Sequence, residues 1–143
     1  MKVGRILEHR NDDVAIISPQ ANLKGAANLM LNHRIAALVV MKSGKAVGLV
    51  SERDIVEALS RHGAAAGLVR VQDILPSRFA VVSPEETIER AMSIMTYERV
   101  RHLPVIDDGK LVGIISLGDI AKYRLEKLEF KTNVRCDVYI AAR

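Results

Sequence analysis

The sequence predicts an α/β fold (α+β) of two similar units, each strand-helix-strand-strand-helix, packed about a pseudo-twofold axis. Three observations predict this fold. The chain repeats itself at an offset of 65 residues, and each repeat mixes strand-like with helix-like hydrophobic spacing. One repeat alone is too short to bury a stable core. Of the 143 residues 49% are hydrophobic but only 3% aromatic, so the core must be built from aliphatic side chains and Met.

The repeat is found by displacing the sequence by 65 positions, which needs no gap from Ala15 to Ile55. The matched pairs include Ser18 with Ser83, Arg34 with Arg99, Gly44 with Gly109, Gly48 with Gly113, and Asp54 with Asp119. A lead-in also recurs at a slightly different offset, since residues 3–7 resemble residues 71–75. We therefore expect a first repeat with an N-terminal lead-in helix at 1–69, a second repeat at 70–128 and a partly helical tail at 129–143. Residues 63–67, rich in Ala and Gly, form the expected linker.

The first half of each repeat predicts a strand and then a helix. Residues 14–17 and 79–82 are short apolar runs, each followed by Ser-Pro. Asn22 and Thr87 have side chains that favour the N-cap position of a helix. Apolar residues at helical spacing then predict a buried stripe in each copy: Leu23, Ala26, Ala27 and Met30, and Ile88, Ala91, Met92 and Met95.

The second half of each repeat predicts a hairpin and a second helix. Two β-branched runs are joined by tight turns at residues 42–45 and 107–110, each with Gly where a positive φ is needed. The second helix is expected to begin after Ser51 and after Ser116. In the second repeat the helical pattern continues through residues 122–129, which extends that helix into the tail.

Composition and charge narrow the classes of function. No apolar run is long enough to span a bilayer, and the start of the chain does not resemble a signal peptide. The single Cys136 excludes an internal disulfide and a site of several Cys ligands, so a cytoplasmic location is expected. The net charge of +4 is typical of a slightly basic soluble protein, and a second interpretation is attraction to phosphates. Nucleic acid is not an expected partner, because a dense Lys/Arg stripe and stacking aromatics are missing.

A Ser-x-x-Asp motif occurs at the same place in both repeats, as Ser51 to Asp54 and Ser116 to Asp119. Each motif follows a strand and opens a helix, so it has an ordinary interpretation as a helix cap. The second interpretation is a ligand site, because α/β folds place ligands at the carboxyl ends of strands. An Asp carboxylate can accept from two ribose hydroxyls, and helix N–H groups can face phosphate.

The order of these motifs, present twice in register, resembles the CBS domain, named after cystathionine β-synthase. The resemblance is carried by residues 38–40 and 44–55 in the first repeat and by residues 101–105 and 109–120 in the second. Two such domains in tandem resemble a Bateman module, as in IMP dehydrogenase and the γ subunit of AMP-activated kinase. The resemblance implies a binding fold with clefts for adenosyl ligands such as AMP, ADP, ATP, S-adenosylmethionine or NAD. It implies no catalytic residue and no metal site.

The resemblance also assigns candidate site residues. Asp54 and Asp119 would bind ribose. The residues that would bind phosphate are Ser51, Arg53, Ser116, Arg99, Arg101 and His102. The residues that would line the adenine and nucleoside pocket are Ser18, Leu23, Ala36, Leu49, Ser83, Ile88 and Ile114. The residues alone also allow ordinary roles, namely a solvated basic face for the Arg and His side chains, core packing for the apolar ones and turn formation for Ser18 and Ser83.

The expected function is therefore an adenine-nucleotide-binding regulatory or sensor module, with a purely structural interaction module as the alternative. We expect no required cofactor, a bound AMP, ADP, ATP or NAD, and a protein target that the sequence does not identify. A homodimer is expected because the tail helix carries Leu125 and Leu128. The two sites are expected to be unequal, since the second repeat has Arg101 and His102 where the first has Ala36 and Ala37.

Overall fold

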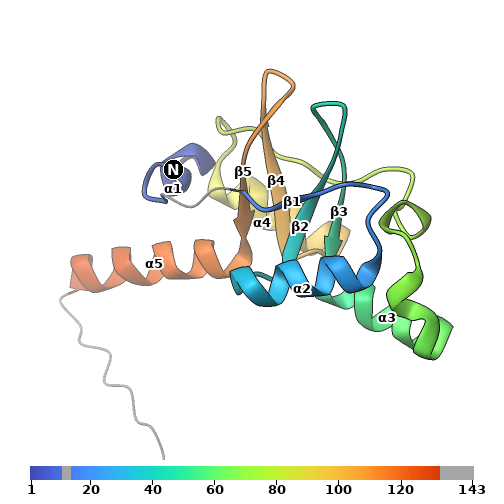
Figure 1. Ribbon diagram of the computed structural model, residues 1–143. Helices are drawn as coiled ribbons and strands as arrows, with labels where there is room; N and C mark the ends of the chain where they lie inside the picture. The colour runs from blue at the N-terminus through green and yellow to red at the C-terminus, as the bar shows by residue number, and fades with distance from the viewer. Residues whose placement is uncertain (11–13, 133–143) are drawn as a thin grey trace, which may run out of the picture.

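The computed structural model describes residues 1–10 and 14–132. Most of the expected tail, residues 133–143, lies outside the described residues. The elements follow in the order α1 (Val3–Glu8), β1 (Ile16–Ile17), α2 (Leu23–His33), β2 (Ala37–Lys42), β3 (Lys45–Ser51), α3 (Glu52–His62), the 3-10 helices η1 (Gly63–Leu68) and η2 (Val71–Asp73), α4 (Ile88–Glu98), β4 (His102–Asp107), β5 (Lys110–Ser116) and α5 (Leu117–Thr132). This order confirms the predicted α/β class with two similar units (Figure 1).

Two antiparallel hairpins, β2-β3 and β4-β5, stand side by side at the centre of the molecule (Figure 1). Strands β3 and β5 contact each other, which joins the two repeats. Both turns have two residues with positive φ, Ser43 at 51° and Gly44 at 78°, then Asp108 at 51° and Gly109 at 78°. Two successive positive φ angles characterise the type I′ turn, whose twist matches that of a hairpin. The turns are therefore where the sequence predicted them.

The first strand of each repeat is shorter than expected. In the first repeat β1 pairs parallel with β2 over only two residues, and the second repeat has only an isolated bridge between Val82 and Val105. Val39 donates its backbone N–H to the carbonyl of Ala15 at 3.2 Å. The equivalent of Val39 in the second repeat is Pro104, which has no N–H to donate. The missing ladder bond explains why residues 79–82 do not form a strand.

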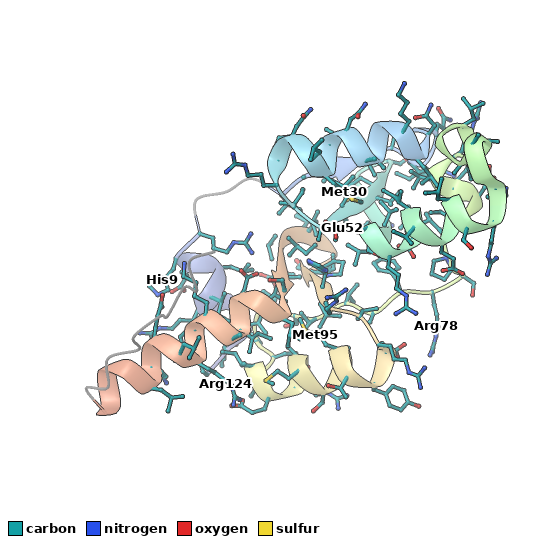
Figure 2. The ribbon with its side chains drawn as sticks, turned by 90° about the horizontal axis from the view of Figure 1, so that it is seen from below. His9, Met30, Glu52, Arg78, Met95 and Arg124 are labelled. Carbon is teal, nitrogen blue, oxygen red and sulfur yellow. The ribbon has the colours of Figure 1, made fainter. Side chains whose placement is uncertain are left out.

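Each repeat has its own aliphatic core. Seen from below, helices α2 and α3 form one pair with Met30 between them, and α4 and α5 form the other pair with Met95 between them (Figure 2). Asn22 and Thr87 cap α2 and α4 by accepting hydrogen bonds from the N–H groups of residues 25 and 90, as the sequence predicted. The stripes predicted at helical spacing supply core residues in both repeats, including Leu23, Ala26 and Met30, and Ile88, Ala91 and Met95.

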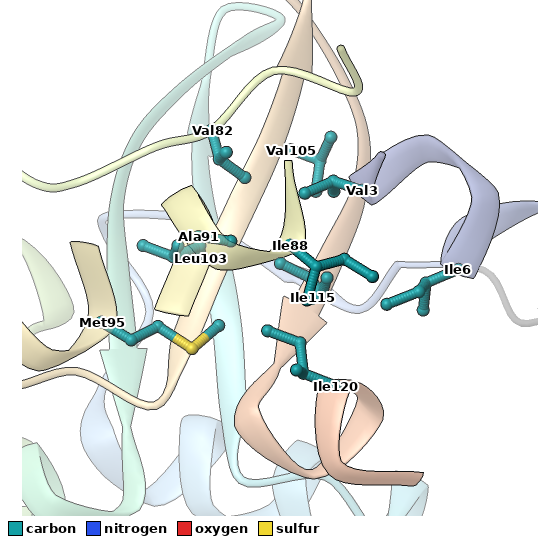
Figure 3. Close-up of a cluster of buried hydrophobic side chains, with 10 residues drawn as sticks. All are labelled: Val3, Ile6, Val82, Ile88, Ala91, Met95, Leu103, Val105, Ile115 and Ile120. Carbon is teal, nitrogen blue, oxygen red and sulfur yellow. The ribbon is translucent and has the colours of Figure 1, made fainter. Parts of the chain in front are cut away.

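The two cores exchange their lead-in segments. Val3 and Ile6 of α1 are buried in the core of the second repeat, beside Ile88 and Ile115 (Figure 3). Val71, at the start of η2, is buried in the core of the first repeat. Each lead-in therefore completes the core of the other repeat.

Matching backbone bonds hold the exchanged segments in place. Val3 donates to the carbonyl of Glu86 at 2.8 Å, and Val71 donates to the carbonyl of Ala21, the repeat equivalent of Glu86, also at 2.8 Å. Leu23 donates to the carbonyl of Val69 at 2.9 Å, as Ile88 does to that of Met1 at 2.9 Å. The recurrence of these bonds shows that the pseudo-twofold relation includes the lead-ins.

Candidate functional site

Two clefts lie where the repeats meet, and each combines residues of both repeats. Cleft A, about 960 Å³, is lined by the Ser51 to Asp54 motif of the first repeat and by residues 98–102 of the second. Cleft B, about 930 Å³, is lined by Ser116 and Asp119 of the second repeat and by residues 33–37 of the first. Glu52, at the start of α3, lies between the two helix pairs (Figure 2). The clefts are thus related in the same way as the repeats.

In cleft A, Asp54 is fixed by its own helix N-terminus. The backbone N–H of Ser51 donates to Oδ2 of Asp54 at 2.7 Å, and the Ser51 hydroxyl donates to the same oxygen at 3.0 Å. The N–H of Asp54 lies 3.4 Å from the Ser51 Oγ, which completes a capping box. Among the described residues, none donates a hydrogen bond to Oδ1 of Asp54. The cap therefore uses one carboxylate oxygen and leaves the other for a ligand.

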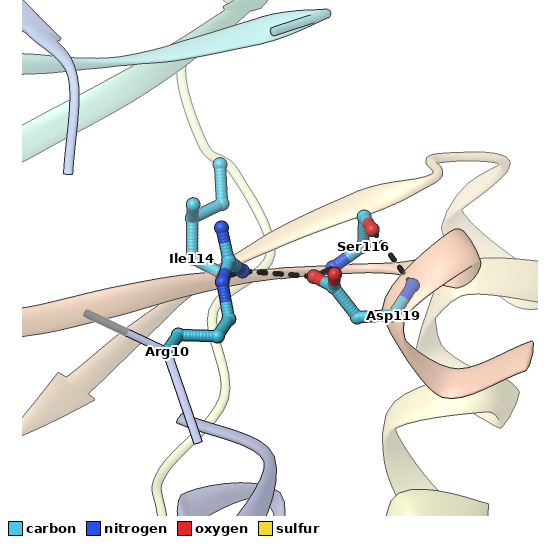
Figure 4. Close-up of polar contacts among 4 residues, drawn as sticks. All are labelled: Arg10, Ile114, Ser116 and Asp119. Carbon is cyan, nitrogen blue, oxygen red and sulfur yellow. Dashed lines mark hydrogen bonds and ion pairs between the residues drawn. The ribbon is translucent and has the colours of Figure 1, made fainter. Parts of the chain in front are cut away.

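In cleft B, Asp119 has the same cap and an additional partner. The N–H of Ser116 donates to Oδ2 of Asp119 at 2.9 Å, and the N–H of Asp119 donates to the Ser116 hydroxyl at 3.0 Å. Arg10 donates from Nη1 to Oδ2 of Asp119 at 2.9 Å and to the carbonyl oxygen of Ile114 at 2.8 Å (Figure 4). Arg10 is therefore the second donor to Oδ2 in cleft B, as the Ser51 hydroxyl is in cleft A.

Arginine side chains surround both clefts. Cleft A is lined by Arg53, Arg78, Arg99 and Arg101, together with the carboxylates of Glu52, Asp54, Glu57 and Glu98. Cleft B is lined by Arg10, Arg34 and Asp119. Arg34 and its repeat equivalent Arg99 both end a helix with positive φ, 53° and 56°, where Gly is the usual residue. An Arg at such a position has a conformational cost, which is consistent with a role for its side chain in the cleft.

His102 lies at the start of β4 and lines both clefts. Burial lowers the pKa of His102 below its ordinary value of 6.5, and the charge of Arg101 lowers it further. The carboxylates of Asp119 and Glu52 act in the opposite direction but do not outweigh burial. The lowered pKa favours the neutral imidazole of His102, which can both donate and accept hydrogen bonds.

The structure brings most of the predicted site residues together. Those that line cleft A are Ala36, Leu49, Ser51, Arg53, Asp54, Arg99, Arg101, His102 and Ser116. Those that line cleft B are Ala36, His102, Ile114, Ser116 and Asp119. Ser116 and Ala36 lie on the wall that the two clefts share.

Four residues expected in the nucleoside pocket line neither cleft. Leu23 and Ile88 are only 1% exposed and belong to the two cores, because each begins the buried stripe of its helix. The hydroxyls of Ser18 and Ser83 accept hydrogen bonds from the N–H groups of residues 20 and 85, at 3.2 and 3.0 Å. Their positions are those of turn-forming residues, which was the ordinary role that the sequence allowed.

Sequence reasoning missed Arg10, Arg34 and Arg78 as cleft residues. Arg34 could have been found, because the repeat aligns it with Arg99. Arg10 and Arg78 also correspond. They align when residues 3–7 are matched with residues 71–75, and not at the offset of 65 residues. Among the described residues there is no cluster of three or more His, Cys, Asp or Glu side chains that could hold a metal ion. No helix within the described ranges has the length and hydropathy to cross a membrane.

Comparison with known proteins agrees with this architecture. The CBS domain family model matches the chain twice, at residues 3–61 and 66–126. CBS domain-containing protein YhcV of Bacillus subtilis is 32% identical over 108 residues, which cover 76% of each chain. The crystal structure of the CBS-domain containing protein ATU1752 from Agrobacterium tumefaciens has a TM-score of 0.82 and 34% identity, covering 87% of this chain and 99% of that one.

A more distant structure shares the fold alone. It is the CBS domain protein PAE2072 from Pyrobaculum aerophilum complexed with AMP, with a TM-score of 0.76 and 23% identity, covering 92% of this chain and 99% of that one. Two family matches in tandem, one for each structural repeat, establish the relationship. The chain belongs to the CBS domain family and is a tandem pair of CBS domains.

Proposed function

We propose that the chain is a regulatory module that binds adenine nucleotides between its two CBS repeats and signals through the conformation of the pair. The observation that carries this proposal is the pair of Ser-x-x-Asp motifs at the clefts. Asp54 and Asp119 are each held by a helix cap through Oδ2, and in neither does a described residue donate to Oδ1. A rigidly held carboxylate with an open acceptor suits a vicinal diol such as that of ribose.

The remaining surroundings suit the other parts of a nucleotide. Apolar side chains of Leu49 in cleft A and Ile114 in cleft B can pack against an adenine ring. The cleft arginines, together with the start of α3 or α5, offer charge-assisted donors to phosphate. The AMP-bound protein from Pyrobaculum aerophilum has the same fold, which supports the choice of an adenosyl ligand. AMP, ADP, ATP and NAD share the groups that these contacts would recognise.

The test is a series of thermal melts of the purified chain with AMP, ADP, ATP, NAD and S-adenosylmethionine, with GMP as the control. A ligand that binds only the folded state stabilises it by roughly 2.7 kcal/mol at a hundredfold excess over its Kd. We expect at least one adenosyl ligand to raise the melting temperature and GMP to have a smaller effect. If no adenosyl ligand changes the melting temperature, the chain is better described as a structural interaction module.

We also propose that the chain forms a homodimer through the second helix of each repeat. Val56 and Leu59 on α3 are 66% and 57% exposed, and Leu117 and Leu125 on α5 are 39% and 52% exposed. Apolar side chains that remain exposed on two equivalent helices favour a closed twofold association. Light scattering should give twice the chain mass, and Leu59→Glu should lower it. A monomer mass at every concentration, with and without nucleotide, would exclude the dimer.

A further inference from the structure

We propose that Arg10 competes with a bound nucleotide for Asp119 in cleft B, so that an adenine nucleotide binds first in cleft A and binds tightly in cleft B only when Arg10 is released. This inference rests on the proposed function, because it assumes that both clefts accept the same class of ligand. Arg10, a residue of the lead-in, would decide which cleft is filled first. Cleft A would be the tighter of the two unequal sites.

The position of the guanidinium of Arg10 is the first argument. It bridges Oδ2 of Asp119, at 2.9 Å, and the carbonyl oxygen of Ile114, at 2.8 Å (Figure 4). Asp119 is the carboxylate expected to bind ribose, and Ile114 is the residue expected to pack against adenine. Oδ1 of Asp119 is still an open acceptor, but a ribose that takes both carboxylate oxygens, or a base that bonds the Ile114 carbonyl, must displace the guanidinium.

The partial burial of this ion pair is the second argument. The side chains of Arg10 and Asp119 are 31% and 26% exposed. An ion pair with little access to water is weakly screened, and its charge-assisted hydrogen bonds are stronger than those between neutral groups. A ligand that takes Asp119 from Arg10 must replace these bonds before it gains any of its own.

Cleft A supplies the internal comparison. Arg78 corresponds to Arg10 in the repeated lead-in, but its side chain is 85% exposed and lies 3.8 Å from Glu98 (Figure 2). The structure contains no ion pair of Arg78 with Asp54, and the second donor to Oδ2 of Asp54, beside the N–H of Ser51, is the Ser51 hydroxyl. Of the two equivalent arginines, Arg10 thus bonds the carboxylate expected to bind ribose in its cleft, and Arg78 does not.

The size of the effect follows from the fraction of molecules in which Arg10 is released. The apparent Kd of a site equals its intrinsic Kd divided by the fraction that is competent to bind. If Arg10 is released in about a tenth of the molecules, nucleotide binding to cleft B weakens about tenfold. Removal of the guanidinium should therefore tighten nucleotide binding to cleft B by about the same factor.

The experiment isolates cleft B with Asp54→Asn, which keeps an acceptor for the helix cap but removes the charge in cleft A. AMP is titrated by calorimetry into the Asp54→Asn chain, with and without Arg10→Ala. The matched control is Arg5→Ala, which removes an exposed positive charge from the same lead-in. Thermal melts of all variants confirm that each one is folded. We expect Arg10→Ala to tighten AMP binding about tenfold or more, and Arg5→Ala to change it by less than about twofold.

The other outcomes are also informative. If Arg10→Ala weakens AMP binding, Arg10 is a phosphate ligand and the proposal is overturned, whereas the proposed function stands. The proposal is also overturned if Arg10→Ala leaves the affinity for AMP unchanged. It is overturned as well if the wild-type chain binds AMP but cleft B of the Asp54→Asn chain binds none, with or without Arg10→Ala. If neither the wild-type chain nor any variant binds AMP, the proposed function fails together with the inference.

Discussion

Leu7 packs so closely on Gly113 that a Cβ at residue 113 would lie 2.9 Å from both Cδ atoms of Leu7. Leu75 has the equivalent position against Gly48, where a Cβ would lie 2.8 Å from its Cδ2. Gly48 and Gly113 correspond in the repeat, and so do Leu75 and Leu7 in the lead-ins. Each contact therefore joins the lead-in of one repeat to the hairpin of the other repeat. Because Arg10 follows Leu7 closely in the chain, this packing also brings Arg10 to cleft B.

Gly113→Ala should destabilise the chain by about 1–3 kcal/mol, because the added methyl group overpacks the contact with Leu7. Leu7→Ala should offset part of that loss, with a coupling energy of at least about 0.5 kcal/mol in a double-mutant cycle of chemical denaturation. The matched control pairs Leu7→Ala with Gly48→Ala, for which we expect additive losses. Coupling of Leu7 to Gly48 in place of Gly113 would contradict the exchange of lead-ins.

Arg99→Gly should weaken AMP binding without lowering the stability of the chain. Glycine adopts the positive φ of this helix end without the penalty of a side chain, so we expect the free energy of unfolding to stay the same or rise by up to about 1 kcal/mol. The same substitution removes a cation from cleft A and should weaken AMP binding about tenfold, since a charge-assisted bond contributes about 1.5–3 kcal/mol. Denaturant unfolding and calorimetry measure the two effects. A variant that binds AMP as tightly as the wild-type chain would remove Arg99 from the phosphate site.

His102 should make stability depend on pH just below neutrality. Its pKa in the folded chain lies below the 6.5 of an unfolded His, so the unfolded chain binds more protons between these two values. The contribution of His102 is therefore fully present above pH 6.5 and is lost as the pH falls through its folded pKa. Unfolding curves of the wild-type chain and of His102→Gln from pH 5 to 8 should show a smaller fall in the variant. Parallel pH profiles would show that His102 does not titrate in this way.

The parts of the fold that the sequence predicted are those with a local physical signal. The caps at Asn22 and Thr87, the Gly-containing turns and the starts of both second helices depend on a few neighbouring residues. No local signal predicts the exchange of the lead-ins, because the spacing of apolar residues in a lead-in is the same whichever of the two cores it packs into. The reduction of the first strand of the second repeat to an isolated bridge at Val82 could have been anticipated from Pro104, which cannot donate to a neighbouring strand.

In the candidate site, too, the residues that the sequence predicted are those with a local signal. The Ser-x-x-Asp motifs were visible because they are short and occur twice in register. Leu23 and Ile88 could not be separated from pocket residues by hydrophobicity alone, since buried and cleft-lining side chains share it. Arg10 could not be found from the motifs, because its contact with Asp119 joins residues more than a hundred positions apart and depends on the exchanged lead-in.

The central claim is that the two Asp carboxylates bind adenine nucleotides between the CBS repeats. Its most direct test is a calorimetric titration of AMP into the wild-type chain and into the Asp54→Asn, Asp119→Asn double variant, with both proteins shown to be folded by thermal melts. We expect saturable binding to the wild-type chain, with the tighter phase absent from the Asp54→Asn single variant. We expect the double variant to lose at least about tenfold in affinity at both clefts. Equal binding by the wild-type chain and the double variant, or no binding of AMP to the wild-type chain, would contradict it.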